Sequence, residues 1–211
     1  MQNGTSRGRG QKRRGLSAFF IGIGILIVLL VTVLLLWPRI GRQIEQPVRE
    51  FFQPFSYPVQ FEELILHYSE ARELDPFLVM GLIQAESSYD SEAVSPVGAR
   101  GLMQIMPNTG QWLAERKGID FQEEYLFIPA YNIRMGTYYL RMLIDMFEVW
   151  DTALAAYNAG MGNVGNWLQD ERYSYDGLTL HTIPFAETRH YVERVNRYME
   201  IYRELYEAES Q

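Results

Sequence analysis

Residues 84–107 read QAESSYDSEAVSPVGARGLMQIMP, and this stretch carries the strongest indications of the fold. A mostly apolar run, FLVMGLI at residues 77–83, precedes a single carboxylate, Glu86. A loop rich in Ser, Asp, Pro and Gly follows, and the motif GLMQIMP at residues 101–107 places one amide, Gln104, between methionines. A carboxyl group at the end of an apolar helix is partly desolvated, which raises its pKa. We therefore expect Glu86 to hold a proton near neutral pH.

Several short motifs occur in a fixed order along the chain. They are Glu86-Ser87, SPVGA at residues 95–99, GLMQIMP, AYNAG at residues 156–160 and IPFAETRHYV at residues 183–192. Together they resemble the catalytic domain of the soluble lytic transglycosylases, over roughly residues 61–206. The resemblance implies a lysozyme-like helical domain. It also implies cleavage of the β-1,4 bond between N-acetylmuramic acid and N-acetylglucosamine in peptidoglycan, ending in a 1,6-anhydro sugar.

The resemblance implies a catalytic role for Glu86. One carboxyl would protonate the leaving glycosidic oxygen and then take the proton of the sugar's own C6 hydroxyl, while the substrate's N-acetyl group stabilises the intermediate. Glycosidases usually work with two carboxylates, but the nearby Asp90 and Glu92 have the character of solvated loop residues. The expected substrate-binding residues are Ser95, Met103, Gln104, Tyr157, Asn158 and Tyr191.

Most of these binding residues also have a purely structural interpretation. Ser95 could cap its own loop, and Gln104 could satisfy loop backbone as a buried amide. Met103, like Met106, could line a sugar groove, although methionine at this spacing is more often core. For Tyr157 a binding role is favoured, because it offers an aromatic face and a hydroxyl to a sugar. For Asn158 a scaffold role is favoured.

The last motif contributes one expected site residue and one expected structural pair. Tyr191 matches a tyrosine that the family places close to its glutamate, here Glu86. Glu187 and Arg189 are interpreted as a pair that holds the helix start. The three histidines are scattered without metal-ligand spacing, and no glycine-rich phosphate loop occurs. No metal and no cofactor is therefore expected.

Charge divides the 211-residue chain into two parts. Residues 1–49 carry eight Lys or Arg and one Glu, whereas residues 50–211 carry eleven Lys or Arg and twenty-five Asp or Glu. A nucleic-acid binder would present a basic folded domain, so that class is disfavoured. The chain has no cysteine, which excludes disulfides, thiolate catalysis and a lipid-modified cysteine anchor.

The N-terminal part predicts a membrane anchor. Residues 1–15 are basic and polar and are expected to form a cytoplasmic tail. Residues 16–37 run without a charge and are long enough for a single transmembrane helix. A cleaved signal peptide is the alternative, but its apolar region would be shorter and would end in a small-residue cleavage site. Five basic residues before the span predict a cytoplasmic N-terminus, with the catalytic part outside the cytoplasmic membrane and facing the cell wall.

Residues 38–58 contain four prolines and are predicted to be a linker. Its VREFFQPF stretch could instead lie along the membrane surface, and Phe51 and Phe52 within it could equally pack on the domain. Residues 59–211 form the predicted catalytic domain, in which Asp75-Pro76 is a start signal for the helix that carries Glu86. Further helices are expected at residues 108–117, 129–147, 152–158 (capped by Asp151) and 185–207. The predicted fold class is mostly α: a lysozyme-like helical domain preceded by a single transmembrane helix.

Three functions remain open from the sequence. The leading interpretation is a membrane-anchored lytic transglycosylase whose partner is the peptidoglycan glycan strand. A lysozyme-type hydrolase of the same fold differs only in whether water or the C6 hydroxyl attacks. A non-catalytic peptidoglycan-binding module is disfavoured, because such a module has no chemical need for Glu86. Nothing in the sequence indicates a protein partner.

Overall fold

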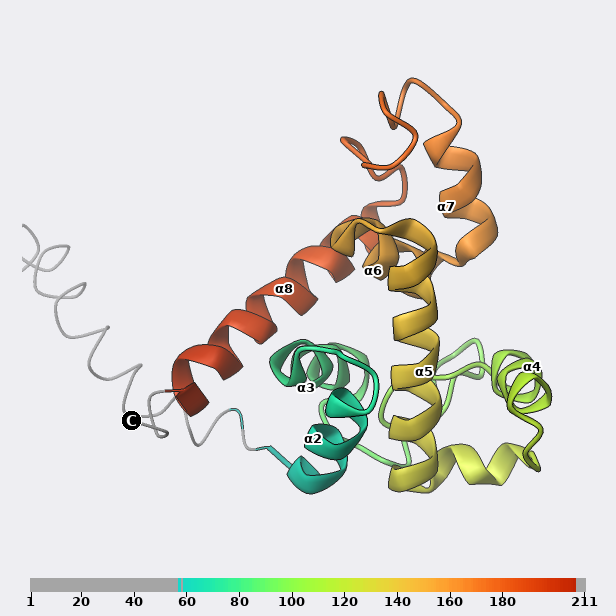
Figure 1. Cartoon of the computed structure of the whole chain (residues 1–211), viewed down its shortest axis with the longest axis vertical. Helices are drawn as coiled ribbons and strands as arrows, with labels where there is room; N and C mark the ends of the chain where they lie inside the picture. Colours follow the sequence, from blue (N-terminus) through green and yellow to red (C-terminus); the bar gives the residue numbers. More distant parts are fainter. Residues whose placement is uncertain (1–56, 58, 208–211) are drawn as a thin grey trace, which may run out of the picture. The chain divides into compact units, whose positions relative to one another are not determined.

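Helices make up most of the part of the chain that the structure, a computed structural model, describes: residue 57 and residues 59–207 (Figure 1). The predicted tail, transmembrane helix and nearly all of the linker lie outside the described residues. No helix in the described part is both long and apolar enough to cross a bilayer. The chain from residue 57 onward forms one unit by its own contacts.

The order of the helices follows the chain. They are α2 (Glu62–Glu70), α3 (Pro76–Ser87), α4 (Pro107–Lys117), the 3-10 helix η1 (Glu123–Phe127), α5 (Pro129–Phe147), α6 (Trp150–Ala159), α7 (Met161–Leu168) and α8 (Ala186–Glu207). In the described residues, β structure is limited to isolated bridges that join Arg100 to Val94 and to Ile105, within the loop between α3 and α4. The predicted mostly-α class is therefore confirmed for this part of the chain.

Helix α3 lies at the centre of the core. Its start is as predicted, because the carboxylate of Asp75 accepts a hydrogen bond of 2.8 Å from the backbone N–H of Phe77, and Pro occupies the first turn. Residues 78–83 are all buried, so this helix is apolar on every side, as expected of a helix enclosed by others. Each fully buried large apolar side chain of this run contributes about 1.5–3 kcal/mol.

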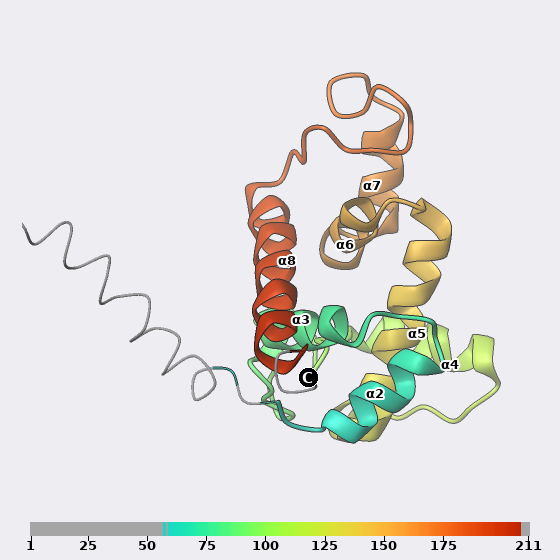
Figure 2. The same ribbon diagram turned by 60° about the vertical axis from the view of Figure 1, so that its left-hand side comes forward.

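Helix α8 packs directly on α3 (Figures 1 and 2). A Cβ atom added to Gly81 would lie 2.7 Å from the backbone nitrogen of Met199 and 2.9 Å from the carbonyl oxygen of Val195. Only a glycine permits this close an approach of the two backbones. The contact brings the last helix of the chain onto the helix that carries Glu86.

The long helix α5 connects the two ends of the domain. Helices α2, α4 and η1 pack against it, and α6 packs against it on the way to α7 and α8 (Figure 1). Its bounds match the predicted 129–147. Ile128 precedes Pro129 and provides no side-chain cap, so the helix start depends on the proline and on packing.

Two features of the helical pattern differ from the prediction. Asp151 lies in the first turn of α6, which begins at Trp150, and does not cap the helix. Its carboxylate instead accepts a hydrogen bond of 2.8 Å from the side-chain amide of Asn196 on α8. Helix α7 was not expected from the sequence, because glycine and asparagine are weak helix formers. The burial of Val164 and Trp167 stabilises it in the folded domain.

Candidate active site

Glu86 lies in the last turn of α3, next to the residue that ends the helix. Its side chain is partly buried. Burial raises the pKa of Glu86 from about 4.5 to about 7, against the opposing effects of a hydrogen bond from Tyr191 and the positive charge of Arg194. The predicted direction of the shift is confirmed. A carboxyl with this pKa is present in both protonation states near neutral pH, as a group that must give and regain a proton requires.

Tyr191 contacts Glu86 directly. Its hydroxyl donates a hydrogen bond of 2.7 Å to Oε1 of Glu86, and its side chain is fully buried. The guanidinium of Arg194, one turn further along α8, lies 5.9 Å from the centre of the Tyr191 ring. The expected proximity of Tyr191 and Glu86 is therefore present, because the packing of α8 on α3 joins the two.

Tyr157, near the end of α6, approaches the same carboxyl. Burial, followed by the nearby charge of Glu86, raises the pKa of Tyr157 well above its ordinary value. The same two causes raise the pKa of Tyr191. Both tyrosines therefore stay neutral donors, and the hydroxyl of Tyr157 donates a hydrogen bond of 2.8 Å to the carbonyl of Met103.

A pocket of about 220 Å³ extends from Tyr157. It brings together three of the expected binding residues, which come from distant motifs: Gln104 from GLMQIMP, and Tyr157 and Asn158 from AYNAG. The remaining lining residues are Ile105, Met106, Thr109, Tyr139, Ala159 and Gly160. An aromatic pocket with a few polar groups is the usual form of a small-ligand site.

Ser95 and Gln104 both hold the loop between α3 and α4. The hydroxyl of Ser95 accepts a hydrogen bond of 3.0 Å from the backbone N–H of Ala99. The Nε2 of Gln104 donates to the carbonyls of Ala93 and Gly101, at 3.1 and 2.9 Å. Ser95 thus caps its own loop, and the Gln104 amide satisfies loop backbone, as the structural interpretation of each residue predicted. The amide oxygen of Gln104 accepts no hydrogen bond from the residues that the structure describes, and Gln104 lines the pocket, so this oxygen is available to a ligand.

The prediction that the side chain of Met103 lines a sugar groove is wrong in this structure. That side chain is fully buried and packs on Gly136 of α5, where an added Cβ would lie 2.3 Å from its sulfur. Met106 is the methionine of this motif that faces the pocket, with 37% of its surface exposed. The reason is local, since Gly101 and Gln104 both have positive φ and the motif turns sharply instead of continuing in one direction.

Asn132 of α5, which is not among the site residues expected from the sequence, organises this turn. Its side chain is buried, and its Oδ1 accepts a hydrogen bond of 2.8 Å from the N–H of Met103. Its Nδ2 donates to the carbonyls of Arg100 and Leu126, at 3.0 and 2.7 Å. An asparagine on the core side of an amphipathic helix was the available signal, because a buried amide must have partners.

The favoured scaffold role of Asn158 is supported, although this residue also lines the pocket. Its Oδ1 accepts a hydrogen bond of 2.8 Å from the hydroxyl of Thr188, a buried residue in the first turn of α8. The expected pair of Glu187 and Arg189 does not form in the described part of the chain. Arg189 instead donates to the carbonyl of Ile183, at 3.2 Å.

Comparison with known proteins agrees with this arrangement. The family model described as "Transglycosylase SLT domain" matches residues 63–177. The soluble lytic murein transglycosylase of Escherichia coli K12 is 35% identical over 153 residues, which cover 70% of this chain and 23% of that protein. The membrane-bound lytic murein transglycosylase C of Actinobacillus pleuropneumoniae is 31% identical over 168 residues, covering 68% of this chain and 46% of that protein.

Solved structures agree as well. An inactive mutant of the lytic transglycosylase Slt from Pseudomonas aeruginosa matches with a TM-score of 0.64 and 35% identity, over 72% of this chain and 25% of that one. The 70-kDa soluble lytic transglycosylase in complex with bulgecin A matches with a TM-score of 0.65 and 31% identity, over the same shares. The chain thus spans about a quarter of the length of these soluble relatives. Its sequence and its fold both place it in the family of the SLT transglycosylase domain.

Proposed function

We propose that this protein is a peptidoglycan lytic transglycosylase. It cleaves the β-1,4 bond between N-acetylmuramic acid and N-acetylglucosamine and leaves 1,6-anhydromuramic acid ends. The observation that carries the proposal is the partly buried Glu86, whose pKa is raised to about 7 and which is hydrogen-bonded by Tyr191. Family membership supports the substrate, since the named relatives are lytic murein transglycosylases.

In the proposed reaction Glu86 acts twice. Its protonated form gives the proton to the glycosidic oxygen as that bond breaks, and the N-acetyl group of the substrate stabilises the electron-poor carbon. The carboxylate then takes the proton of the C6 hydroxyl while the C6 oxygen bonds to that carbon. The proton returns to Glu86, and no water is consumed. The Tyr191 hydroxyl favours the carboxylate formed between the two steps, because it donates to Oε1.

The surroundings of Glu86 favour this route over hydrolysis by an inverting mechanism. Such a hydrolase keeps a second carboxylate about 6.5–9.5 Å away to activate water. Within the described residues, no acidic side chain contributes to the pKa shift of Glu86. Asp90 and Glu92 are exposed, and Asp90 accepts a hydrogen bond from the backbone N–H of Glu92. A C6 hydroxyl tethered to the reacting sugar has a high effective concentration and needs no such base.

We assign the pocket beside Tyr157 to a sugar unit next to the cleaved bond. Gln104 offers its free amide oxygen, Tyr157 an aromatic face, and Met106 an adaptable apolar edge. Asn158 is exposed at the same pocket and keeps its amide nitrogen for a ligand, since only its oxygen is bonded to Thr188. The Ser95 hydroxyl accepts one hydrogen bond and retains its own proton, which it can donate to the substrate.

We further propose that residues 16–37 anchor the protein in the cytoplasmic membrane, with the catalytic domain outside. The uncharged run and the basic residues before it support this topology, as does a relative named as membrane-bound. Protease added to intact cells stripped of their wall should digest the catalytic domain. Mature protein that begins near residue 40 would show that the run is a cleaved signal peptide.

The products decide the reaction. Purified peptidoglycan is digested with the full-length protein in water labelled with oxygen-18, and the fragments are analysed by mass spectrometry. We expect non-reducing 1,6-anhydromuramoyl ends without the label. Reducing muramic acid ends that carry oxygen-18 would instead identify a hydrolase.

A further inference from the structure

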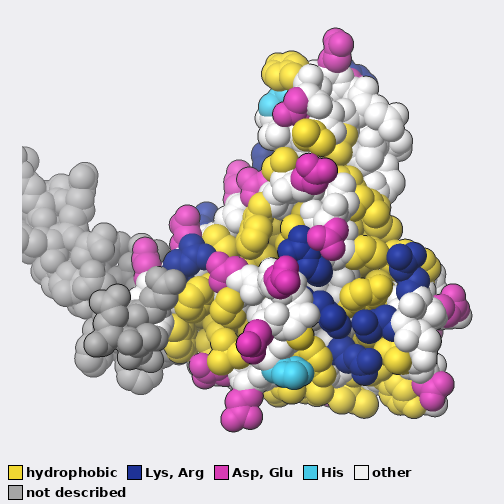
Figure 3. Space-filling model, viewed as in Figure 1, with side chains coloured by type: hydrophobic (Ala, Val, Ile, Leu, Met, Phe, Trp, Pro, Cys, Tyr) yellow, Lys and Arg dark blue, Asp and Glu magenta, His cyan; other side chains and the backbone are white. Residues whose placement is uncertain are grey.

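Three cations converge where α2, α4 and α5 meet. Arg72 follows α2, Lys117 ends α4, and Arg134 lies on α5. The Cζ of Arg72 lies 5.4 Å, and the Nζ of Lys117 4.0 Å, from the centre of the Tyr138 ring, so two cations share one aromatic ring. These three residues are the basic cluster. In Figure 3, Lys and Arg side chains gather beside hydrophobic surface on the face shown there.

The basic cluster has no acidic partner among the residues that the structure describes. The ion pairs in that part of the chain are Arg100–Glu123, Arg141–Asp145, Arg172–Asp170 and Arg203–Asp75. All three cluster residues are half-buried, and Nε of Arg72 is buried without a hydrogen-bond partner. Burial and the charges of Arg72 and Arg134 lower the pKa of Lys117. Unneutralised like charges repel one another, so an anion bound here would relieve the repulsion.

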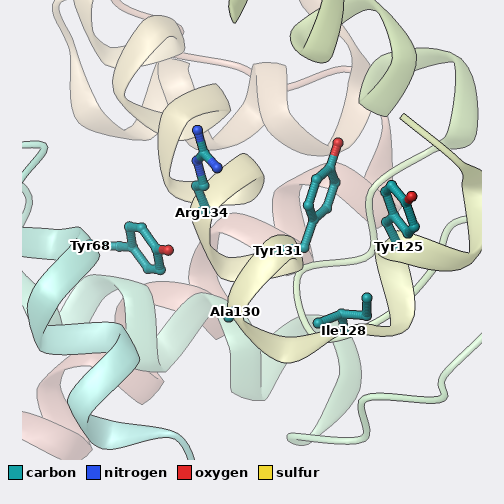
Figure 4. A pocket seen from close by; sticks show the side chains of 6 residues that line it. All are labelled: Tyr68, Tyr125, Ile128, Ala130, Tyr131 and Arg134. Atoms are coloured by element: carbon teal, nitrogen blue, oxygen red, sulfur yellow. The ribbon is translucent and has the colours of Figure 1, made fainter. Parts of the chain in front are cut away.

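A pocket of about 330 Å³ adjoins the basic cluster (Figure 4). Arg134 belongs to both. In Figure 4 the Arg134 side chain stands between Tyr68 on one side and Tyr131 on the other. The Tyr131 hydroxyl donates to the backbone carbonyl of Asp120, at 3.0 Å, which holds this ring in place. The remaining lining residues are Tyr125, Ile128 and Ala130. Aromatic walls beside one cation suit a ring-shaped ligand that carries a negative charge.

This pocket is separate from the candidate active site. The two pockets share no lining residue. On α5, Tyr131, Arg134 and Tyr138 follow one another at spacings of three and four, so they lie on one face of the helix. Tyr139, which lines the pocket beside Tyr157, points away from that face, because successive helical residues are turned by roughly 100°.

We propose that the basic cluster and its adjoining pocket bind an anionic sugar unit, one that bears a phosphate or a carboxylate. The oxyanion is held by the guanidinium of Arg134 with the charges of Arg72 and Lys117, since arginine pairs with both kinds of oxyanion through two parallel hydrogen bonds. The sugar ring packs on Tyr68 and Tyr131. This site does not depend on the proposed catalytic activity.

The test measures binding by calorimetry on the full-length protein in neutral detergent. The probes are glucose 6-phosphate, glucuronic acid, inorganic phosphate and glucose. We expect at least one charged sugar to bind with a dissociation constant on the order of 1 mM, more tightly than glucose or inorganic phosphate. The two charged sugars distinguish a phosphate from a carboxylate ligand.

Substitutions connect the binding to the site. Arg134→Gln should weaken binding of the charged sugar about tenfold, which corresponds to about 1.4 kcal/mol. Tyr68→Ala should weaken binding of the charged sugar more than it weakens binding of inorganic phosphate. Arg197→Gln removes a positive charge from an exposed position of α8 and is the matched control. It should change neither the affinity for the charged sugar nor the affinity for inorganic phosphate.

Three outcomes would overturn the proposal. The first is that neither charged sugar binds saturably. The second is that Arg134→Gln keeps both its circular dichroism spectrum and its affinity for the charged sugar. The third is that Arg197→Gln loses as much affinity as Arg134→Gln. Peptidoglycan cleavage is not part of this measurement. The binding site and the proposed activity can therefore fail independently.

Discussion

Replacing Glu86 by Gln should abolish cleavage and at the same time stabilise the protein above neutral pH. The amide has the shape of the protonated acid but neither donates nor recovers a proton, and general acid–base catalysis is worth about 10²–10⁴ in rate. Burial raises the pKa of Glu86 from about 4.5 to about 7. One pKa unit corresponds to about 1.4 kcal/mol, so ionisation of Glu86 lowers the free energy of unfolding by about 3 kcal/mol.

The sign of this pH dependence follows from the raised pKa. A carboxyl whose pKa is higher in the folded state than in the unfolded state favours folding while it is protonated in both. That contribution is complete below pH 4.5 and is lost as the pH rises through 7. Glutamine does not titrate. The stability of Glu86→Gln relative to the wild type should therefore grow by about 3 kcal/mol between pH 4 and pH 8.

Urea unfolding of the full-length protein, followed by tryptophan fluorescence at several pH values, measures this difference. Glu92→Gln, the same substitution at an exposed loop position, should retain activity. A stability difference between Glu86→Gln and the wild type that stays constant from pH 4 to pH 8 would refute the argument that Glu86 is desolvated. Turnover close to wild type by Glu86→Gln would refute its catalytic role.

Three further changes test the surroundings of Glu86. Tyr191→Phe removes the hydrogen bond that lowers the pKa of Glu86, so the alkaline limb of the pH profile of kcat/KM should move up by about one unit; an unchanged limb would exclude this role. Gly81→Ala should destabilise the domain by about 1–3 kcal/mol in urea unfolding. Its matched control is Gly165→Ala on α7, where an added Cβ meets nothing within 4 Å, and it should be neutral or stabilising. Asn132→Ala leaves the N–H of Met103 and two carbonyls without their partner, at a cost of about 1–3 kcal/mol for each buried group left unpaired. The thermal midpoint of unfolding should therefore fall, and an unchanged midpoint would contradict the role assigned to Asn132.

Local signals predicted the helices well. Asp75-Pro76 marks the start of α3, and the helix expected from residue 129 begins at Pro129, because capping and proline geometry act within a few residues. The raised pKa of Glu86 was also predictable, since the apolar run before it predicts burial of that end of the helix.

Features that depend on contacts distant in sequence were not predictable. GLMQIMP contains two methionines, and only the turn at Gly101 and Gln104 decides that Met103 points into the core and Met106 toward the pocket. The fit of Met103 against Gly136 joins segments more than thirty residues apart. Helix spacing placed Asn132 on a helix but did not identify the three backbone groups that it satisfies.

One packing contact affects both the stability of the domain and the proposed chemistry. Gly81 allows the backbone of α8 to approach α3 at Val195 and Met199, and the same helix carries Tyr191, whose hydroxyl lies 2.7 Å from Glu86. A methyl group at Gly81 must move one helix away from the other, because the atoms that it meets are backbone. A hydrogen bond weakens steeply once its geometry is lost. Gly81→Ala should therefore shift the pH profile of cleavage in the same direction as Tyr191→Phe, at temperatures where the variant is still fully folded.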